Sequence, residues 1–427
     1  MIDWVEREND PELKALLQPL FVERRLVVWS ADFHVAPVTD LKSLLTPLGV
    51  EFIDLSLSPH CNLVCNCDAK KRLKVIRQGN VLNIQEENFR LFYDAYYNDT
   101  EFARVDAFFV AYPMSTFENY MPFNRSIIAL AATRYENARF ITRTWTRMNH
   151  RLRTLAANPL NVVAANSLYE LEYVRYFSGV QSVYLQSFCA YTQVYYSPSP
   201  DRQTYLLSAL RGELDGDAAE FGAMWRREFN LSYTRRGASF VLETLRKRYQ
   251  GVYSYADLVS HLGIVYVPYQ ISYMSIYEQY RMHIPLFFPS LELLTKWQHT
   301  YWIMTERTWD GVGRKRPHGS YQKPYQQRHS QQHDGAIITQ APDPNNEWDE
   351  EAIKHWLAYS DFYTLPHFVL YKSVDDLVQI LEEKTEQELR ETSERMRKYS
   401  RGVLAELLRF WRAQLLRIAQ ASTNRPH

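Results

Sequence analysis

The 427-residue sequence lacks the glycine-rich loops that mark several large enzyme classes. No Gly-x-Gly-x-x-Gly follows an apolar run, so a dinucleotide-dependent dehydrogenase is not supported. There is no phosphate-binding loop ending in Gly-Lys-Ser or Gly-Lys-Thr, and no Gly-x-Ser-x-Gly turn of an α/β-hydrolase. Function must therefore be inferred from the order of elements and from residues near the ends of strands.

A surplus of charge and long apolar runs are also lacking. Lys and Arg together number 49, as do Asp and Glu, so no net charge indicates a nucleic-acid partner. No apolar run reaches the roughly 18 residues of a membrane span, and the first residues are too charged for a signal peptide. With 46% hydrophobic and 23% charged residues, the chain is predicted to be a soluble, cytoplasmic globular protein.

Cysteine is scarce, since four residues are too few for a disulfide scaffold in a chain of this length. Three of them, Cys61, Cys65 and Cys67, lie close to His60 in the sequence, which offers four potential zinc ligands. Their spacing is tighter than in familiar zinc sites, and no second group of ligands follows. We therefore expect free thiols in a loop rather than a metal site.

Strand and helix signals alternate along the first half of the chain. A protein of 427 residues exceeds the usual size of one hydrophobic core, so two domains are expected. Apolar runs separated by helical segments are typical of a parallel sheet covered on both faces. The predicted strands are 26–30, 50–55, 105–112, 126–131 and 161–166, and the clearest helices are 86–98 and 168–177.

The alternation starts again after a probable linker at 197–200, Ser-Pro-Ser-Pro. A second doubly wound unit is the economical interpretation, which gives domains 1–196 and 197–383 and a helical segment 384–427. The predicted strands of this unit are 205–210, 264–268 and 284–288, and the predicted helices are 218–229 and a basic helix 238–249.

Two further segments stand apart from this pattern. The stretch 310–334 is basic and has no aliphatic run, so it is predicted to be a mobile surface insertion, either a solvated loop or a lid over phosphate or an acidic acceptor. The stretch 374–421 has helical periodicity and is predicted to cross back to the first domain. One apolar stripe runs along it: Leu404, Leu407, Leu408, Trp411 and Leu415.

The most informative segment, 263–290, indicates a strand, a polar turn, a short helix and a strand. Ligands of open parallel sheets bind at the carboxyl ends of strands, and the turn after Pro268 lies at such an end. The following helix start exposes backbone N–H groups against which a diphosphate can bind. One turn further on, the carboxylate of Glu278 could accept two hydrogen bonds from a ribose diol.

This segment resembles the donor-binding segment of GT-B glycosyltransferases in Ser272, Ser275, Glu278 and the run Ile284-Pro285-Leu286. In that family a strand leads through a serine-containing turn to a short helix with a glutamate, and a proline-containing strand follows. The resemblance implies that Glu278 binds the ribose of the nucleotide. The order of elements resembles GT-B over most of the chain, whereas the match of individual residues is confined to this segment. Met282-His283-Ile284 departs from the small residue that the family usually has before the proline strand.

The resemblance implies two Rossmann-like doubly wound domains that face an interdomain cleft. Domain 1–196 would hold a glycan or other acceptor, and domain 197–383 would hold the nucleotide-sugar donor. Transfer would be independent of metal and of any resident cofactor, since the nucleotide-diphosphate sugar is a substrate. The cleft would close to exclude water, which competes with the acceptor as nucleophile.

The same residues have a simpler interpretation. Ser275-Ile276-Tyr277-Glu278 is also a capping-box pattern, in which Glu278 would only accept a hydrogen bond from the backbone of Ser275. The position between two buried strands of a second Rossmann-like unit favours donor binding. Basic groups near strand ends would hold the phosphates, and the candidates are Arg211, after the strand 205–210, and Arg281.

Candidate catalytic and acceptor residues follow strands of the first domain. His34 comes after the strand 26–30 and has a pKa suited to a general base, and Asp32 could orient it, although a loop pair bonded to backbone is an equal alternative. Glu118, after the third strand, is a candidate for acceptor contact. Asn166, after the fifth strand, is expected to line the same cleft.

Three alternatives remain open. Asp215 and Asp217 fit the Asp-x-Asp pattern of metal-dependent GT-A enzymes, but they are better placed to cap the helix predicted at 218. A nucleotide-sugar epimerase could use the same scaffold. A catalytically inactive glycan-binding protein could use an aromatic cleft, because 30 Tyr and 10 Trp offer flat rings that suit sugars.

Overall fold

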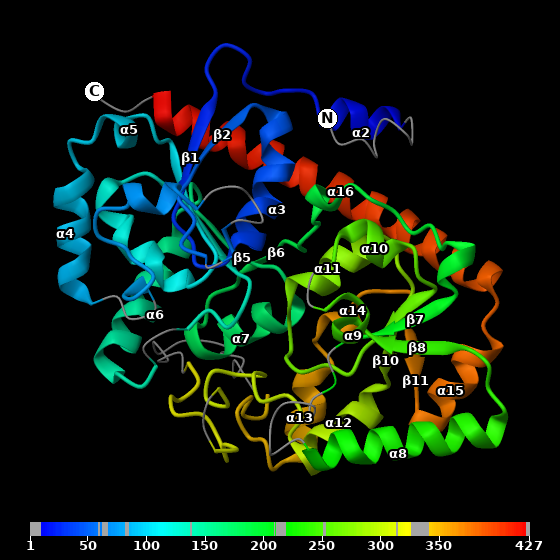
Figure 1. The fold of residues 1–427 in the computed structure, drawn as a ribbon. Helices are drawn as coiled ribbons and strands as arrows, with labels where there is room; N and C mark the ends of the chain where they lie inside the picture. The colour runs from blue at the N-terminus through cyan, green and yellow to red at the C-terminus, as the bar shows by residue number, and fades with distance from the viewer. Residues whose placement is uncertain are drawn as a thin grey trace, which may run out of the picture. The chain divides into compact units, whose positions relative to one another are not determined.

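The computed structural model describes residues 10–58, 60–61, 67–81, 85–136, 139–208, 210, 219–250, 253–312, 315–325 and 341–423. The chain forms two compact units (Figure 1). Unit 1 comprises Met1–Tyr191, Tyr321–Gln340 and Val403–His427, and unit 2 comprises Thr192–Ser320 and Ala341–Gly402. The first boundary therefore lies close to the predicted one at 196.

The described part of unit 1 contains a six-stranded sheet of order β2-β1-β3-β4-β5-β6, and every neighbouring pair is parallel. The side chains of β1, β3, β4 and β5 are buried throughout, as expected for strands covered on both faces. The five predicted strands are confirmed. The strands are β1 (Leu26–Ser30), β2 (Val50–Asp54), β3 (Ala107–Val110), β4 (Ser126–Ala131), β5 (Val162–Ala165) and β6 (Val183–Tyr184).

Helices connect the strands of unit 1. They are α2 (Pro11–Leu16), α3 (Val35–Leu45), α4 (Glu86–Tyr96), α5 (Thr100–Ala103), α6 (Thr142–Ala157) and α7 (Leu168–Ser178). Short 3₁₀ turns lie at η1 (Thr46–Leu48), η3 (Ala69–Arg72), η5 (Met114–Asn119), η6 (Met121–Phe123) and, around the unit boundary, η7 (Ala190–Thr192) and η8 (Pro200–Arg202).

Unit 2 contains a second parallel sheet, of order β11-β10-β9-β7-β8. Its strands are β7 (Thr204–Leu207), β8 (Val241–Thr244), β9 (Gly263–Val265), β10 (Leu286–Pro289) and β11 (Val369–Tyr371). Its helices are α8 (Ala219–Arg236), α9 (Leu245–Tyr249), α10 (Tyr255–Val259), α11 (Met274–Arg281), α12 (Leu291–Tyr301), α13 (Glu350–Leu357), α14 (Asp361–Thr364) and α15 (Val374–Glu383).

Two predicted helices are corrected. The segment 238–249 is not one basic helix, because it forms the edge strand β8 and then the short helix α9, which begins where the Thr244 side chain accepts a hydrogen bond from the N–H of Lys247. The stretch 374–421 is two helices, α15 and α16 (Glu386–Thr423). They are separated because Thr385 and Glu388 form reciprocal capping hydrogen bonds, which start a new helix.

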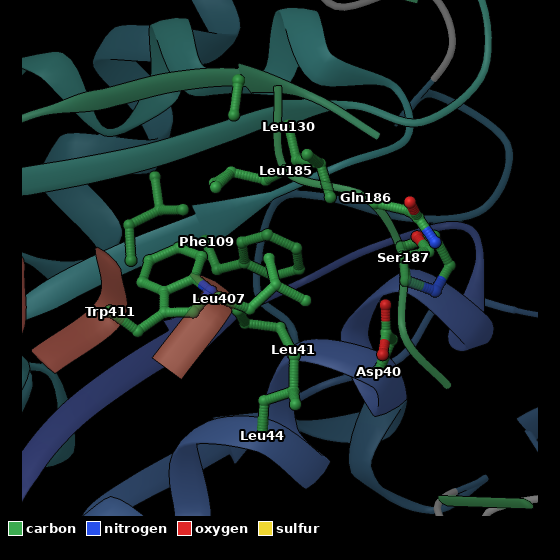
Figure 2. A pocket seen from close by; sticks show the side chains of 13 residues that line it. Asp40, Leu41, Leu44, Phe109, Leu130, Leu185, Gln186, Ser187, Leu407 and Trp411 are labelled. Atoms are coloured by element: carbon green, nitrogen blue, oxygen red, sulfur yellow. The ribbon is translucent and has the colours of Figure 1, made fainter. Parts of the chain in front are cut away.

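The apolar stripe of α16 lies in unit 1, where Leu404, Leu407, Leu408, Trp411 and Leu415 are buried. Figure 2 shows Leu407 and Trp411 beside Leu41 of α3 and Phe109 of β3. The cavity between these side chains is only about 20 Å³ and mainly apolar, so it is a packing gap rather than a ligand site.

The insertion predicted at 310–334 is partly anchored. In its described part, 310–312 and 315–325, the Arg316 guanidinium donates to the carbonyl of Glu347 and lies 4.1 Å from the centre of the Trp348 ring. His318 stacks on the same indole at 5.1 Å. These contacts attach Arg316 and His318 to Glu347 and Trp348. The mobility of the insertion stays a prediction, and Arg328 lies outside the described residues.

Both sheets have the doubly wound topology, since the chain starts at an inner strand, adds one strand on one side and then continues on the other. The predicted fold class, two Rossmann-like units with a long C-terminal helix, is confirmed. The predicted interdomain cleft stays a prediction. None of the described helices has both the length and the apolar character that crossing a membrane requires.

Candidate functional site

Each sheet has one point at which the strand order reverses, between β1 and β3 in unit 1 and between β7 and β9 in unit 2. Two loops diverge there at the carboxyl ends of the strands and leave a crevice in which ligands of such folds bind. The loop after β1 carries Asp32 and His34, and the segment after β9 leads to Glu278. These two strand-end regions are therefore the candidate functional sites, one in each unit.

In unit 1, Asp32 connects the two loops at the reversal point. Its side chain, 1% exposed, accepts hydrogen bonds from the backbone N–H groups of Ala111 and Tyr112 at 2.7 and 2.9 Å, and from that of His34 at 2.9 Å. Burial raises the pKa of Asp32 to about 7, against the lowering effect of these hydrogen bonds, and the charge of Asp54 raises it further. Asp32 thus fixes the backbone of His34 and makes no hydrogen bond with its imidazole.

His34 is the N-cap residue of α3, but its side chain makes no capping hydrogen bond. The centre of its imidazole ring is 4.3 Å from that of the Tyr112 ring. His34 is exposed, yet the protein around the ring removes enough water to lower its pKa to about 4, and the charges of Arg134 and His60 also lower it. The imidazole is therefore neutral at pH 7 and able to accept a proton.

We expect Asp32→Asn to destabilise unit 1 by about 1–3 kcal/mol, because an amide cannot accept hydrogen bonds at both of its terminal atoms and leaves a buried donor unpaired. Chemical denaturation at pH 8, where the native carboxyl group is mostly ionised, measures the effect. Asp94→Asn on exposed helix α4 is the control and should change stability little. An Asp32→Asn protein as stable as the wild type would contradict this structural role.

The two predicted acceptor residues are buried and bonded. Glu118 in η5 is 3% exposed, and its carboxylate forms ion pairs with Arg147 at 3.0 Å and Arg151 at 3.0 Å, both on α6. Asn166, after β5, donates a hydrogen bond from its side chain to Ser187 at 3.2 Å. These placements favour packing roles, and contact of either residue with an acceptor stays a prediction.

Sequence reasoning missed two buried carboxyl groups, that of Glu136 after β4 and that of Glu170 on α7. Glu136 accepts a hydrogen bond from the Tyr173 hydroxyl at 2.6 Å, and Glu170 accepts one from the Arg134 N–H at 2.6 Å. Both side chains are fully buried, and burial raises the pKa of Glu136 to about 8 and that of Glu170 to about 7. The only local signal was a Ser-x-x-Glu pattern at Ser167, which predicts a helix start rather than this burial.

In unit 2, Glu278 lies in the second turn of α11. Its carboxylate is half-buried and accepts a hydrogen bond from the Tyr255 hydroxyl at 2.9 Å. The helix begins at Met274, and the side chain of its N-cap residue, Tyr273, makes no capping hydrogen bond. The capping-box alternative is therefore wrong, because Ser275 lies inside the helix rather than at its N-cap.

The other predicted donor residues that the structure describes lie on this helix or just before it. The Ser272 hydroxyl is buried and donates a hydrogen bond to Asp361 at 3.2 Å. The Ser275 side chain forms a hydrogen bond with that of Tyr266. Arg281 is 2% exposed, and its guanidinium lies 5.1 Å from the centre of the Tyr195 ring and donates to that hydroxyl at 3.3 Å. The structure thus places Arg281 in the interior of unit 2, and its contact with a phosphate stays a prediction.

Arg211 and the pair Asp215 and Asp217 lie outside the described residues. Two tyrosines that sequence reasoning did not single out lie near Glu278 instead. Tyr255 is its hydrogen-bond donor, and Tyr253 is about half exposed, with a pKa that burial and the negative charge of Glu278 both raise. The abundance of tyrosine in the sequence was the only signal for them.

The cysteine-rich loop differs from the prediction. Cys61 and Cys67 form a disulfide, whereas free thiols were expected. Their Cα atoms are 4.8 Å apart, which lies within disulfide range. Cys65 lies outside the described residues, and within the described ranges no group of three or more His, Cys, Asp or Glu side chains is arranged to hold a metal ion.

No family model and no curated protein matches the chain. Two solved structures are similar to it along most of the chain. The glycotransferase of kitacinnamycin shares 10% identity over 92% of this chain and 99% of its own, with a TM-score of 0.40. The Arabidopsis thaliana protein UGT89C1, complexed with quercetin, shares 14% identity over 90% of this chain and 99% of its own, with a TM-score of 0.40. This likeness assigns no site residue, and the fold rests on the two sheet topologies.

Proposed function

We propose that this protein is a GT-B glycosyltransferase that transfers a sugar from a nucleotide-diphosphate sugar, bound by unit 2, to a glycan or other acceptor, bound by unit 1. The observation that carries the proposal is the placement of Glu278. Its carboxylate lies on the helix after β9, beside the reversal point of the second sheet, and does not cap its own helix. A half-buried carboxylate at such a position suits a ribose diol.

The start of α11 complements this carboxylate. The N-cap residue Tyr273 makes no side-chain capping hydrogen bond, and the positive end of the helix dipole favours an anionic diphosphate bound beside it. The Tyr255 hydroxyl holds Glu278 in one orientation, which lowers the entropy lost on binding. We further propose that transfer needs neither a metal ion nor a resident cofactor, since helix and basic groups would neutralise the diphosphate.

In unit 1, we assign the general base to His34. A proton must leave the acceptor hydroxyl as it attacks the sugar, and a neutral imidazole accepts it. Asp32 positions the His34 backbone through its N–H hydrogen bond and is not a catalytic residue.

His34→Ala is expected to lower kcat of transfer by about 100-fold, the lower end of the range for general bases, because a pKa near 4 makes the imidazole a weak base. The wild-type rate should stay constant from pH 8 to about 5 and fall as His34 is protonated near pH 4. Initial rates measured across this range test both statements. Loss of activity on acidification with a midpoint near 6.5 would contradict the lowered pKa.

Isothermal titration with a panel of nucleoside diphosphates tests the proposal as a whole. Binding of one of them supports a nucleotide-sugar enzyme, and no binding by any of them favours a glycan-binding protein without catalysis. Product analysis of the bound donor, with and without acceptor, then separates transfer from epimerisation: conversion of the donor sugar without acceptor would overturn the transferase proposal.

A further inference from the structure

Unit 1 contains a second pocket, formed by residues of α6 and α7 and the segment 321–325. Its volume is about 420 Å³, within the range of roughly 300–1,000 Å³ typical of small-molecule sites. None of its lining residues belongs to the loops after β1 and β3. It is therefore separate from the candidate site around Asp32 and His34.

Aromatic rings form much of its wall. Trp145 of α6 and Phe177 of α7 are buried and pack edge to face, with ring centres 5.6 Å apart. Tyr321 is 58% exposed and also packs edge to face, against Phe140 at 5.1 Å. The exposed ring of Tyr321 suits the apolar C–H face of a sugar ring.

Contacts with unit 1 hold the polar part of the wall in place. Arg153 donates to the Ser178 carbonyl at 3.0 Å, and its guanidinium lies 4.8 Å from the centre of the Tyr325 ring. The Tyr325 ring packs on Gly179, where an added Cβ atom would lie 2.3 Å from it. The Gln322 amide donates to the Arg139 carbonyl at 2.5 Å. The side chains that face the pocket are thus positioned before a ligand arrives.

The charge of the lining is one-sided. Arg153 and the exposed Lys323 both line the pocket, and none of the lining residues that the structure describes is Asp or Glu. An anion therefore gains two cationic partners without a carboxylate to repel it. Asn149 and Gln322 add amide groups that can bind sugar hydroxyls.

We propose that this pocket binds a sugar carrying one anionic group, a carboxylate or a phosphate or sulfate ester. The ring lies against the aromatic wall, and the anionic group pairs with Arg153 and Lys323. This site is additional to the proposed donor and acceptor sites and does not depend on them.

Saturation-transfer NMR and isothermal titration with glucuronic acid, glucose 6-phosphate, glucose 6-sulfate and glucose test the proposal. At least one charged sugar is expected to bind about tenfold more tightly than glucose or better, because a single charge-assisted hydrogen bond contributes that much. The sugar that binds most tightly identifies the anionic group. Its Kd should rise with salt, because Lys323 is exposed. Lys323→Gln and Tyr321→Ala should each raise Kd by roughly tenfold.

Matched controls lie elsewhere in unit 1. Lys42→Gln on α3 removes an exposed charge, and Tyr97→Ala removes a ring that is 62% exposed, and neither should change Kd. Glu278→Ala should leave this binding intact, so the donor-site proposal can fail independently. Equal binding of glucose and the charged sugars, binding of inorganic phosphate as tight as that of glucose 6-phosphate, or unchanged binding by Lys323→Gln would each overturn the proposal.

Discussion

Replacing Glu278 with alanine is expected to lower the affinity for the nucleoside diphosphate by roughly 100-fold, because each hydrogen bond from a ribose hydroxyl to a carboxylate contributes about 1.5 kcal/mol or more. The fold should be unaffected. Glu278 is only half-buried, and the Tyr255 hydroxyl donates a hydrogen bond to it at 2.9 Å. Isothermal titration of the variant and the wild type against the same nucleotide measures the loss.

Two graded variants sharpen this experiment. Glu278→Gln retains one acceptor oxygen and should lose about tenfold in affinity. Tyr255→Phe leaves the carboxylate in place but removes the hydroxyl that orients it, so a loss of only a few-fold is expected.

The control is Glu292→Ala, which removes a carboxylate that is 72% exposed at the start of α12 in the same unit. It removes the same charge from unit 2 and should leave nucleotide affinity unchanged. If Glu278→Ala binds the nucleotide as tightly as the wild type does, Glu278 does not hold the ribose. The donor site must then be sought elsewhere in unit 2.

Apart from the edge strand β2, the predicted strands of both units were found because they are buried on both faces, which gives them an uninterrupted apolar sequence. The missed strands lack that signal. β6 and β8 each lie at the edge of a sheet, and their side chains are partly exposed. β11 is also an edge strand and has only three residues. Uninterrupted apolar runs in the sequence therefore indicate the inner strands, whereas the edge strands β6, β8 and β11 cannot be recognised from such runs.

The candidate site was only partly predictable for a different reason. The loop positions of Asp32, His34 and Glu278 follow from the rule that ligands meet the carboxyl ends of strands. The partners of Asp32 lie about 80 residues away along the chain, at Ala111 and Tyr112, and no local pattern indicates them. Arg281 had the right charge and sequence position, but its burial is decided by the packing around Tyr195.

The burial of Glu136 and Glu170 predicts that unit 1 loses stability as the pH rises. A glutamate whose pKa is raised on folding is more stably protonated in the native state than in the unfolded state. Its contribution is fully present below the unfolded pKa of about 4.5 and is lost as the pH rises through the folded pKa, about 8 for Glu136 and about 7 for Glu170. The free energy of unfolding should therefore fall between pH 5 and 8.

Glu136→Gln removes this dependence while keeping an acceptor for the Tyr173 hydroxyl. At pH 5 the variant should be about as stable as the wild type. At pH 9 it should be more stable by on the order of 3 kcal/mol, since each pKa unit corresponds to about 1.4 kcal/mol. Calorimetric scans at both pH values measure the shift in Tm of the transition that includes unit 1.

Glu87→Gln on exposed α4 is the matched control, and its Tm should follow the wild type at both pH values. The double variant with Glu170→Gln should extend the gain at pH 9, because it also removes the cost of ionising Glu170, whose pKa burial raises to about 7. A Glu136→Gln protein that is destabilised at pH 9 would mean that the ionised carboxylate is stabilised by Arg139 in the native state and that its pKa is not raised on folding. The buried acid would then be half of an ion pair rather than a protonated group.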